Sequence, residues 1–163
     1  MPARATAAVA AVLLSVFAAL CAWFIRENSV TADEYVHVPV GICYMNQGVY
    51  ELDHQGNPPL VRRLLALPHL GSNFSPDISD PALRQDRYRV GWLFLRQFFD
   101  TYHEVFASSR AVNVAVGAAL LLLLFAAAWR MYGAAGGIAA GVLFAFSPNF
   151  IAHSSLATLD TAA

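Results

Sequence analysis

The chain has 163 residues, of which 58% are hydrophobic and only 13% are charged. A soluble domain of this length could not bury so much apolar area, because small domains leave a large share of their surface exposed, so the composition predicts a membrane protein. The formal net charge of -1 argues against a nucleic-acid partner, which would require a clustered basic excess.

The first predicted element is an apolar run at residues 5–25, which lies between Arg4 and Arg26. About 20 apolar residues in a helix match the thickness of the hydrocarbon core, so the run predicts a membrane helix. The alternative is a cleaved signal peptide, whose apolar core usually has about 7 to 15 residues. The greater length of this run, and the lack of a small-x-small cleavage site near Cys21, favour the uncleaved helix. Cys21 and Cys43 are predicted to be packing residues rather than a disulfide pair.

A long polar segment follows at residues 26–109 and carries most of the charged side chains. Thr31 and Glu34 have the spacing of a capping box, in which each side chain accepts a hydrogen bond from the other residue's amide. This spacing predicts a helix start, and Pro39 predicts that the helix is short or kinked. The positive-inside rule does not constrain long loops, so the arginines of this segment do not decide its orientation, and we expect it on the outer face of the membrane.

Two surface-lying helices are predicted within this segment. The first begins after Asn57, which precedes a double proline, and its apolar residues oppose Arg62 and Arg63. That pattern is typical of a helix in the membrane interface, so we expect both arginines to face lipid head groups or a lipid phosphate. The second begins at Asp80, after a loop at residues 71–80, and carries aromatic side chains suited to the head-group layer as far as Tyr102.

The last part of the chain is again apolar, and Ser108 or Ser109 is predicted to cap its first helix. These elements make the fold an all-α membrane protein, a helix bundle with three to four membrane helices and an extracytoplasmic loop of short interfacial helices. The remaining predicted elements are the second membrane helix at residues 110–129, a turn at 130–133, the third membrane helix at 134–150, broken near Pro148, and the start of a fourth at 154–163.

An ordered series of motifs runs from Asp33 to Asp160. Together with the apolar spans, this series resembles the family 39 membrane glycosyltransferases of GT-C fold, which are the protein O-mannosyltransferases and their bacterial relatives that use a phospholipid carrier. Two departures are Asn57, where members often have His, and Arg62 and Arg63, where members often have Lys. The matching motifs are Asp33-Glu34-x-x-His37, Gly41, Gly48-x-Tyr50, Pro58-Pro59-Leu60, Leu67-Pro68, Arg110, Tyr132-Gly133, Phe146-Ser147-Pro148-Asn149, Ala152-His153 and Ala157-Thr158-Leu159-Asp160.

The resemblance implies an enzyme that transfers one mannose-like sugar from a polyprenyl-phosphate carrier to an acceptor hydroxyl, with inversion at the anomeric carbon. The acceptor would be a protein, a lipid or a glycan, and membrane lipids would be further partners. No nucleotide sugar is needed, and a divalent metal is compatible with the reaction but not required. The expected location is the bacterial inner membrane, with several spans and an extracytoplasmic active site.

Such a reaction needs a base beside the acceptor hydroxyl and positive charge or dipoles beside the departing phosphate. Asp33 is the predicted catalytic base, and Glu34 is the weaker catalytic candidate because the capping box gives it a structural role. Repulsion between these neighbouring carboxylates should raise the proton affinity of one of them. Asp160 is expected in the wall of the active site, on the same side of the membrane as Asp33. The predicted substrate-binding residues are His37, Arg62, Arg63 and Asp160.

Each of these residues also has a purely structural interpretation. Asp33 could serve only the dipole of a helix N-terminus, and the histidines and arginines could be ordinary interface contacts. Asp33, Glu34, His37 and the pair Asp53-His54 could in principle gather a divalent metal, but they lack the paired-histidine spacing of a zinc site.

A second hypothesis comes from another functional class. It is a small non-catalytic membrane protein whose extracytoplasmic loop binds a partner. Because members of the resembled family are several times longer and this sequence stops inside a predicted helix, we expect an N-terminal fragment that is inactive alone. A reading frame that continues past Ala163 into further apolar spans would distinguish the two hypotheses.

Overall fold

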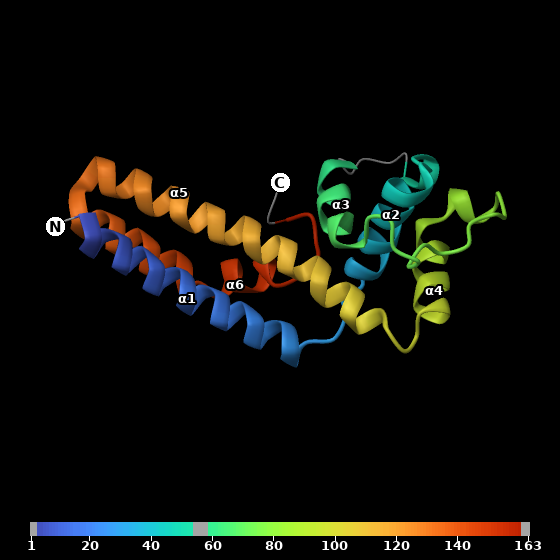
Figure 1. The fold of residues 1–163 in the computed structure, drawn as a ribbon, viewed down its shortest axis with the longest axis horizontal. Coiled ribbons are helices and arrows are strands. Elements are labelled where there is room, and N and C mark those ends of the chain that lie inside the picture. Colours follow the sequence, from blue (N-terminus) through green and yellow to red (C-terminus); the bar gives the residue numbers. More distant parts are fainter. Residues whose placement is uncertain (1–2, 54–58, 161–163) are drawn as a thin grey trace.

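The computed structural model describes residues 3–53 and 59–160, whose arrangement is shown in Figure 1. These residues form helices and connecting loops and include no β-strand, which confirms the all-α prediction for the described part of the chain. Two helices, Arg4–Glu27 and Tyr102–Ala145, are long and apolar enough to cross a membrane. Both contain runs that the sequence predicted as membrane helices.

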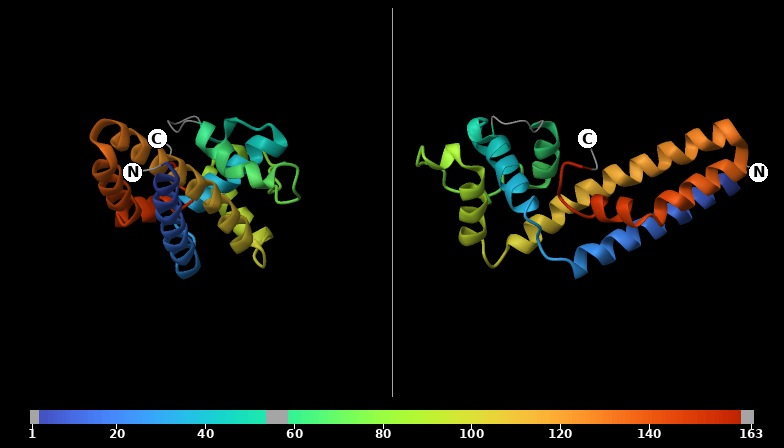
Figure 2. Two further views of the ribbon diagram at one scale, coloured as in Figure 1. Left: turned by 60° about the vertical axis from the view of Figure 1, so that its left-hand side comes forward. Right: turned by 180° about the vertical axis from the view of Figure 1, so that it is seen from behind.

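A bundle of long helices forms one end of the molecule. α1 (Ala3–Glu27) packs along α5 (Tyr102–Ala145), which consists of two helices joined at Gly133, where φ is 73°. Glycine adopts this left-handed conformation readily, so the chain reverses there and the second half of α5 returns beside α1 (Figure 1, Figure 2). The buried side chains between these helices are Leu13, Phe17, Cys21, Leu121, Phe125, Phe144 and Ala145.

The third and fourth membrane helices remain predictions. The second half of α5, residues 134–145, is about 18 Å long at about 1.5 Å per residue, which is shorter than a hydrocarbon core of about 30 Å. α6 (Pro148–Ser154) follows after a break at Ser147, close to the predicted break. Residues 155–160 form turns and bends, so the helix predicted to start at residue 154 does not form in the described part of that segment.

Shorter helices form the other end of the molecule, beyond the end of α1 (Figure 1). Two predictions fail here, the first of them in part. α2 continues past Pro39 to Gln47, with buried residues on both sides of the proline, so the prediction of a short helix is wrong, while a kink at Pro39 stays a prediction. The elements of this region are α2 (Glu34–Gln47), η1 (Glu51–Asp53), α3 (Pro59–Ala66), η2 (Leu67–His69), η3 (Leu83–Gln85) and α4 (Arg87–Gln97).

The second failure concerns helix starts. The helix expected from Asp80 begins instead at Arg87, because the carboxylate of Asp86 accepts hydrogen bonds from two amides in the first turn of α4. Asp80 accepts an amide hydrogen bond in a separate turn. α5 begins at Tyr102, so the serines predicted as its cap lie inside the helix.

Two glycines allow the helices around α2 to approach closely. A Cβ atom at Gly41 of α2 would overlap the carbonyl oxygen of Arg62 in α3. A Cβ atom at Gly91 of α4 would likewise overlap the carbonyl oxygen of Tyr35 in α2. Backbone oxygens cannot move aside as flexible side chains do, so these contacts fix the position of α2 between α3 and α4.

The contact at Gly41 predicts the effect of a single added methyl group. Gly41→Ala should lower the free energy of unfolding by about 1–3 kcal/mol, because overpacking forces the backbones of α2 and α3 apart. Gly48→Asn is the matched control: Gly48 ends α2 with φ of 68° and open space around it, and asparagine tolerates that conformation. Thermal unfolding of both variants in detergent, followed by circular dichroism, measures the difference. Equal stability of the two variants would contradict the assigned helix contact.

Candidate functional site

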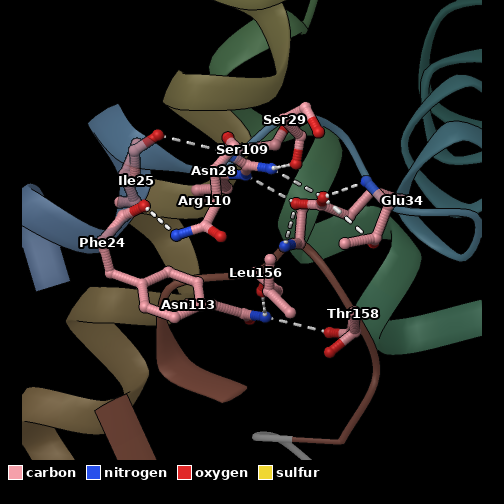
Figure 3. A network of polar contacts seen from close by, with 12 residues as sticks. Phe24, Ile25, Asn28, Ser29, Glu34, Ser109, Arg110, Asn113, Leu156 and Thr158 are labelled. Carbon is pink, nitrogen blue, oxygen red and sulfur yellow. Dashed lines mark hydrogen bonds and ion pairs between the residues drawn. The ribbon is translucent and has the colours of Figure 1, made fainter. Parts of the chain in front are cut away.

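A buried ion pair joins α2 to α5 (Figure 3). The Nε of Arg110 lies 2.7 Å from Oε1 of Glu34, and an Nη of Arg110 lies 2.8 Å from Oε2. Glu34 is 0% exposed and Arg110 is 4% exposed. The two planar groups therefore meet in the bidentate geometry that makes arginine–carboxylate pairs strong and directional.

Glu34 accepts three further hydrogen bonds. Its carboxylate accepts from the Thr31 amide at 2.9 Å and from the Thr31 hydroxyl at 3.1 Å. It also accepts from the amide of Ala157 at 2.7 Å, across a large separation in sequence. The predicted capping box is thus half present: Glu34 reaches back to the Thr31 amide, but the Thr31 hydroxyl donates to Glu34 instead of accepting from its amide.

Arg110 also caps the end of α1. Its guanidinium donates to the carbonyl oxygens of Ile25 at 3.3 Å, Asn28 at 3.0 Å and Ser29 at 2.8 Å. The last carbonyls of a helix have no partner within the helix, and a cation nearby is favourable there. With the two bonds to Glu34, all five N–H groups of Arg110 are matched by acceptors.

The segment after α6 is held to α5 by a second polar side chain. Asn113, one turn after Arg110, donates from its side-chain amide to the carbonyls of Leu156 at 2.6 Å and Thr158 at 2.9 Å. Asn113 is buried, and its bonds satisfy backbone groups that would otherwise be unpaired. Three segments far apart in sequence, around residues 34, 110 and 157, therefore meet at one place.

The network determines the charge of Glu34. Burial alone would raise the pKa of this carboxyl, but the hydrogen bonds from Arg110, Ala157 and Thr31 and the charge of Arg110 outweigh burial. The pKa of Glu34 is consequently lowered from its ordinary value. Glu34 is held as a carboxylate whose oxygens are already occupied, which is a poor state for a base.

Asp33, the predicted base, differs from its neighbour. Its side chain is exposed, and the bonds of the network go to Glu34 rather than to it. Its carbonyl oxygen accepts from the amides of Val36 and His37 in the first turn of α2. The adjacent acidic residues therefore point to different surroundings, one into the protein and one into solvent.

Asp160 lies three residues after Ala157, whose amide binds Glu34. Its Oδ2 lies 3.4 Å from Nδ1 of His153, and both side chains are more than half exposed, at 62% and 53%. The hydrogen bond between Glu34 and Ala157 thus brings the segment that carries Asp160 to the segment that carries Asp33.

Arg62 and Arg63, like Glu34 and Asp33, differ in exposure although they are adjacent in sequence. Arg62 is 0% exposed, so the interpretation that it faces lipid head groups is wrong. Its Nε donates to Nδ1 of His37 at 3.1 Å and its Nη to the Tyr44 hydroxyl at 3.3 Å. Arg63 is exposed, and its guanidinium lies 5.0 Å from the centre of the Tyr50 ring. Two of the predicted site residues, Arg62 and His37, are therefore joined by a hydrogen bond between their side chains.

A metal site is not assembled by the described side chains. Among them, no group of three His, Cys, Asp or Glu residues lies close enough to hold a metal ion. His54, which the metal hypothesis included, and Asn57 and Pro58, at the predicted helix start, lie outside the described residues. Cys43 is buried, which raises the pKa of its thiol to about 12, so it does not supply a thiolate.

Sequence reasoning assigned no role in the site to Asn113 or His69. A polar residue within an apolar span was an available signal for Asn113, since such residues usually face another polar group. Nε2 of His69 lies 3.1 Å from the carbonyl oxygen of Val105 and 3.2 Å from the Ser109 hydroxyl, which fastens the loop after α3 to α5. Burial lowers the pKa of His69, which favours the neutral ring.

Comparison of the chain with protein-family models, with curated proteins and with solved structures found no match. The case for a function therefore rests on the sequence motifs and on the geometry of the residues that carry them.

Breaking the buried pair of Glu34 and Arg110 should destabilise the protein far more than breaking a surface ion pair. Arg110→Ala should lower the free energy of unfolding by about 3–5 kcal/mol, because it leaves the Glu34 carboxylate buried without its partner. The double variant with Arg110→Ala and Glu34→Ala should lose less unfolding free energy than the two single variants lose in sum. The matched control is Arg89→Ala, which breaks a largely exposed pair with Asp86 and should change stability by less than about 1 kcal/mol. Denaturant unfolding in detergent tests this, and equal losses for Arg110→Ala and Arg89→Ala would contradict it.

The lowered pKa of Glu34 predicts a specific pH dependence of stability. A carboxyl whose pKa is lower in the folded state contributes fully above its unfolded pKa, about 4.3, and loses that contribution as the pH falls through the folded pKa. The melting temperature of the wild-type chain should therefore fall more steeply with acidification below that value than the melting temperature of Glu34→Gln. The Ser79 amide also lowers the pKa of Asp77, but Asp77 is present in both proteins, so it contributes equally. Parallel curves would show that Glu34 titrates normally.

Proposed function

We propose that the chain forms part of an inverting membrane glycosyltransferase. It would transfer a single mannose-like sugar from a polyprenyl-phosphate carrier to an acceptor hydroxyl at the outer face of the bacterial inner membrane. The two long apolar helices are compatible with a lipid-borne donor, because they would place the polar region next to the bilayer surface.

One observation carries this proposal. The 2.7 Å hydrogen bond from the Ala157 amide to Glu34 joins the motif that carries the predicted base, Asp33, to the motif that carries the predicted active-site residue Asp160. Asp33 is adjacent to Glu34, and Asp160 is three residues from Ala157. The bond between Glu34 and Ala157 therefore supports placing Asp33 and Asp160 in one site.

The surroundings of the acidic pair support a division of roles. Glu34 is fully occupied by Arg110, Thr31 and Ala157, so we assign it to positioning. Asp33 is exposed and would take the proton of the acceptor hydroxyl as that oxygen forms its bond to the anomeric carbon. The bond from the anomeric carbon to the phosphate oxygen breaks in the same step, and its electron pair leaves with the carrier phosphate.

We also assign different roles to the two neighbouring arginines. Arg62 is buried against His37, so it would position that imidazole rather than contact a phosphate. Arg63 is exposed on the same helix and would be the arginine available to an anionic head group. Stacking on Tyr50 limits the freedom of its side chain, which reduces the entropy lost on binding.

The test is the loss of transfer in Asp33→Asn. Removing a general base should lower the transfer rate by about 10²- to 10⁴-fold, while the exposed position of Asp33 leaves expression and folding unchanged. Asp100→Asn is the matched control, since Asp100 is an exposed aspartate in the loop before α5. The assay measures sugar transfer from a polyprenyl-phosphate sugar in membranes that contain the complete gene product. Full transfer by Asp33→Asn would remove Asp33 from the base role, and no transfer by the wild type would favour the non-catalytic alternative.

A further inference from the structure

A cavity of about 420 Å³ lies between the end of α1 and the first turns of α5. Residues 25–30, at the end of α1 and in the loop after it, form one wall. The other wall is one face of α5, formed by His103, Phe106, Ala107 and Arg110. Small-molecule sites usually have volumes of about 300–1,000 Å³, so this cavity is large enough for a ligand.

The cavity lies where α1 would leave a membrane. The part of α1 that is long and apolar enough to cross a bilayer ends at Glu27. Trp23 is 62% exposed, and tryptophan is enriched at membrane–water interfaces. Arg26 follows three residues later, so it lies on the same face of the helix as Trp23. The cavity is therefore at the level of phospholipid head groups.

Opposite charges face this cavity from neighbouring positions. Arg26 and Glu27 both line it, and both residues are exposed. Within the described residues, no ion pair involves either side chain. Both charges are thus available to a ligand, and a ligand that carries one negative and one positive group would complement them.

The wall at residues 25–30 is fixed from inside the protein. The guanidinium of Arg110 donates to three carbonyl oxygens of this wall. Its remaining N–H groups bind Glu34, whose carboxylate balances its charge, so Arg110 positions the wall and does not bind the ligand itself. The buried ring of Phe106 closes the cavity on the side of α5. A wall that is ordered in advance reduces the entropy lost on binding.

We propose that this cavity binds the head group of a phospholipid of the phosphoethanolamine type. The phosphate oxygens accept hydrogen bonds from the guanidinium of Arg26, and the ammonium group donates to the carboxylate of Glu27. A choline head group has no N–H group to donate, and a glycerol head group carries no cation to compensate Glu27. The lipid is a resident of the bilayer and not a substrate, so the site goes beyond the proposed transfer reaction and does not depend on it.

The experiment measures the binding of three phospholipids with identical acyl chains to the chain in detergent, by native mass spectrometry. They are phosphatidylethanolamine, phosphatidylcholine and phosphatidylglycerol. The wild type should bind phosphatidylethanolamine about tenfold more tightly than phosphatidylcholine, because it gains a hydrogen bond to a charged group. Glu27→Ala should bring the ratio of these two affinities close to one. Arg26→Ala should weaken the binding of both lipids by similar factors, since both carry the phosphate.

Each variant has a matched control on its own or the facing helix. Arg4→Ala removes an exposed arginine at the other end of α1, and Glu104→Ala removes an exposed glutamate of α5; neither residue lines the cavity. Both controls should keep the wild-type affinities. Equal binding of phosphatidylethanolamine and phosphatidylcholine by the wild type, or an unchanged ratio in Glu27→Ala, would overturn the proposal.

Two further outcomes would assign the cavity differently and also overturn the proposal. The first is tightest binding of phosphatidylglycerol, which would mean that Arg26 recruits an anionic lipid. The second is displacement of phosphatidylethanolamine by an equal concentration of soluble phosphoethanolamine, which would mean a soluble ligand. Sugar transfer by Asp33→Asn has no bearing on these affinities, so a failure of the proposed function and a failure of this lipid site are distinguished.

Discussion

The bidentate contact between Glu34 and Arg110 is the interaction on which the arrangement of this chain depends. Arg110 uses its five N–H groups on the Glu34 carboxylate and on carbonyls at and beyond the end of α1. Glu34 in turn binds the start of its own helix and the amide of Ala157. One guanidinium and one carboxylate thereby join four segments, and a lysine could not replace the arginine because it lacks the planar fork of donors.

Burying two charges is unfavourable unless nearly every donor and acceptor is satisfied, so such a pair adds less to stability than its short distances suggest. The main effect of the pair is to favour one relative position of the segments that it joins. Any displacement of α1, α2 or the segment at residue 157 would leave a charge or a backbone group unpaired in a region of low dielectric. That constraint gives the neighbouring Asp33 a defined place although its own side chain makes no bond in the network.

Composition predicted the long helices well and the tertiary polar contacts poorly. The run at residues 5–25 became α1, and the turn predicted at 130–133 contains the reversal at Gly133, because apolar length and glycine act locally. Arg62 was misjudged, since a charge pattern on one helix cannot show that His37 and Tyr44 surround it after folding. The start of α4 was placed too early, because Asp80 caps a separate turn and Asp86 accepts from the first amides of the helix.

Tertiary hydrogen bonds also explain why residues 155–160 do not form a helix, although an apolar segment precedes them. Asn113 binds the carbonyls of Leu156 and Thr158, and Glu34 binds the amide of Ala157, so these three backbone groups are paired without helical bonds. Beside helices apolar enough to cross a membrane, irregular backbone is tolerated where protein buries it or where it lines a polar cavity. The first condition holds here, because Asn113 of α5 and Glu34 of α2 both bind the backbone of the segment. These polar side chains take the place of the helical hydrogen bonds that the segment lacks, so its irregular course depends on the same network that orders the start of α2.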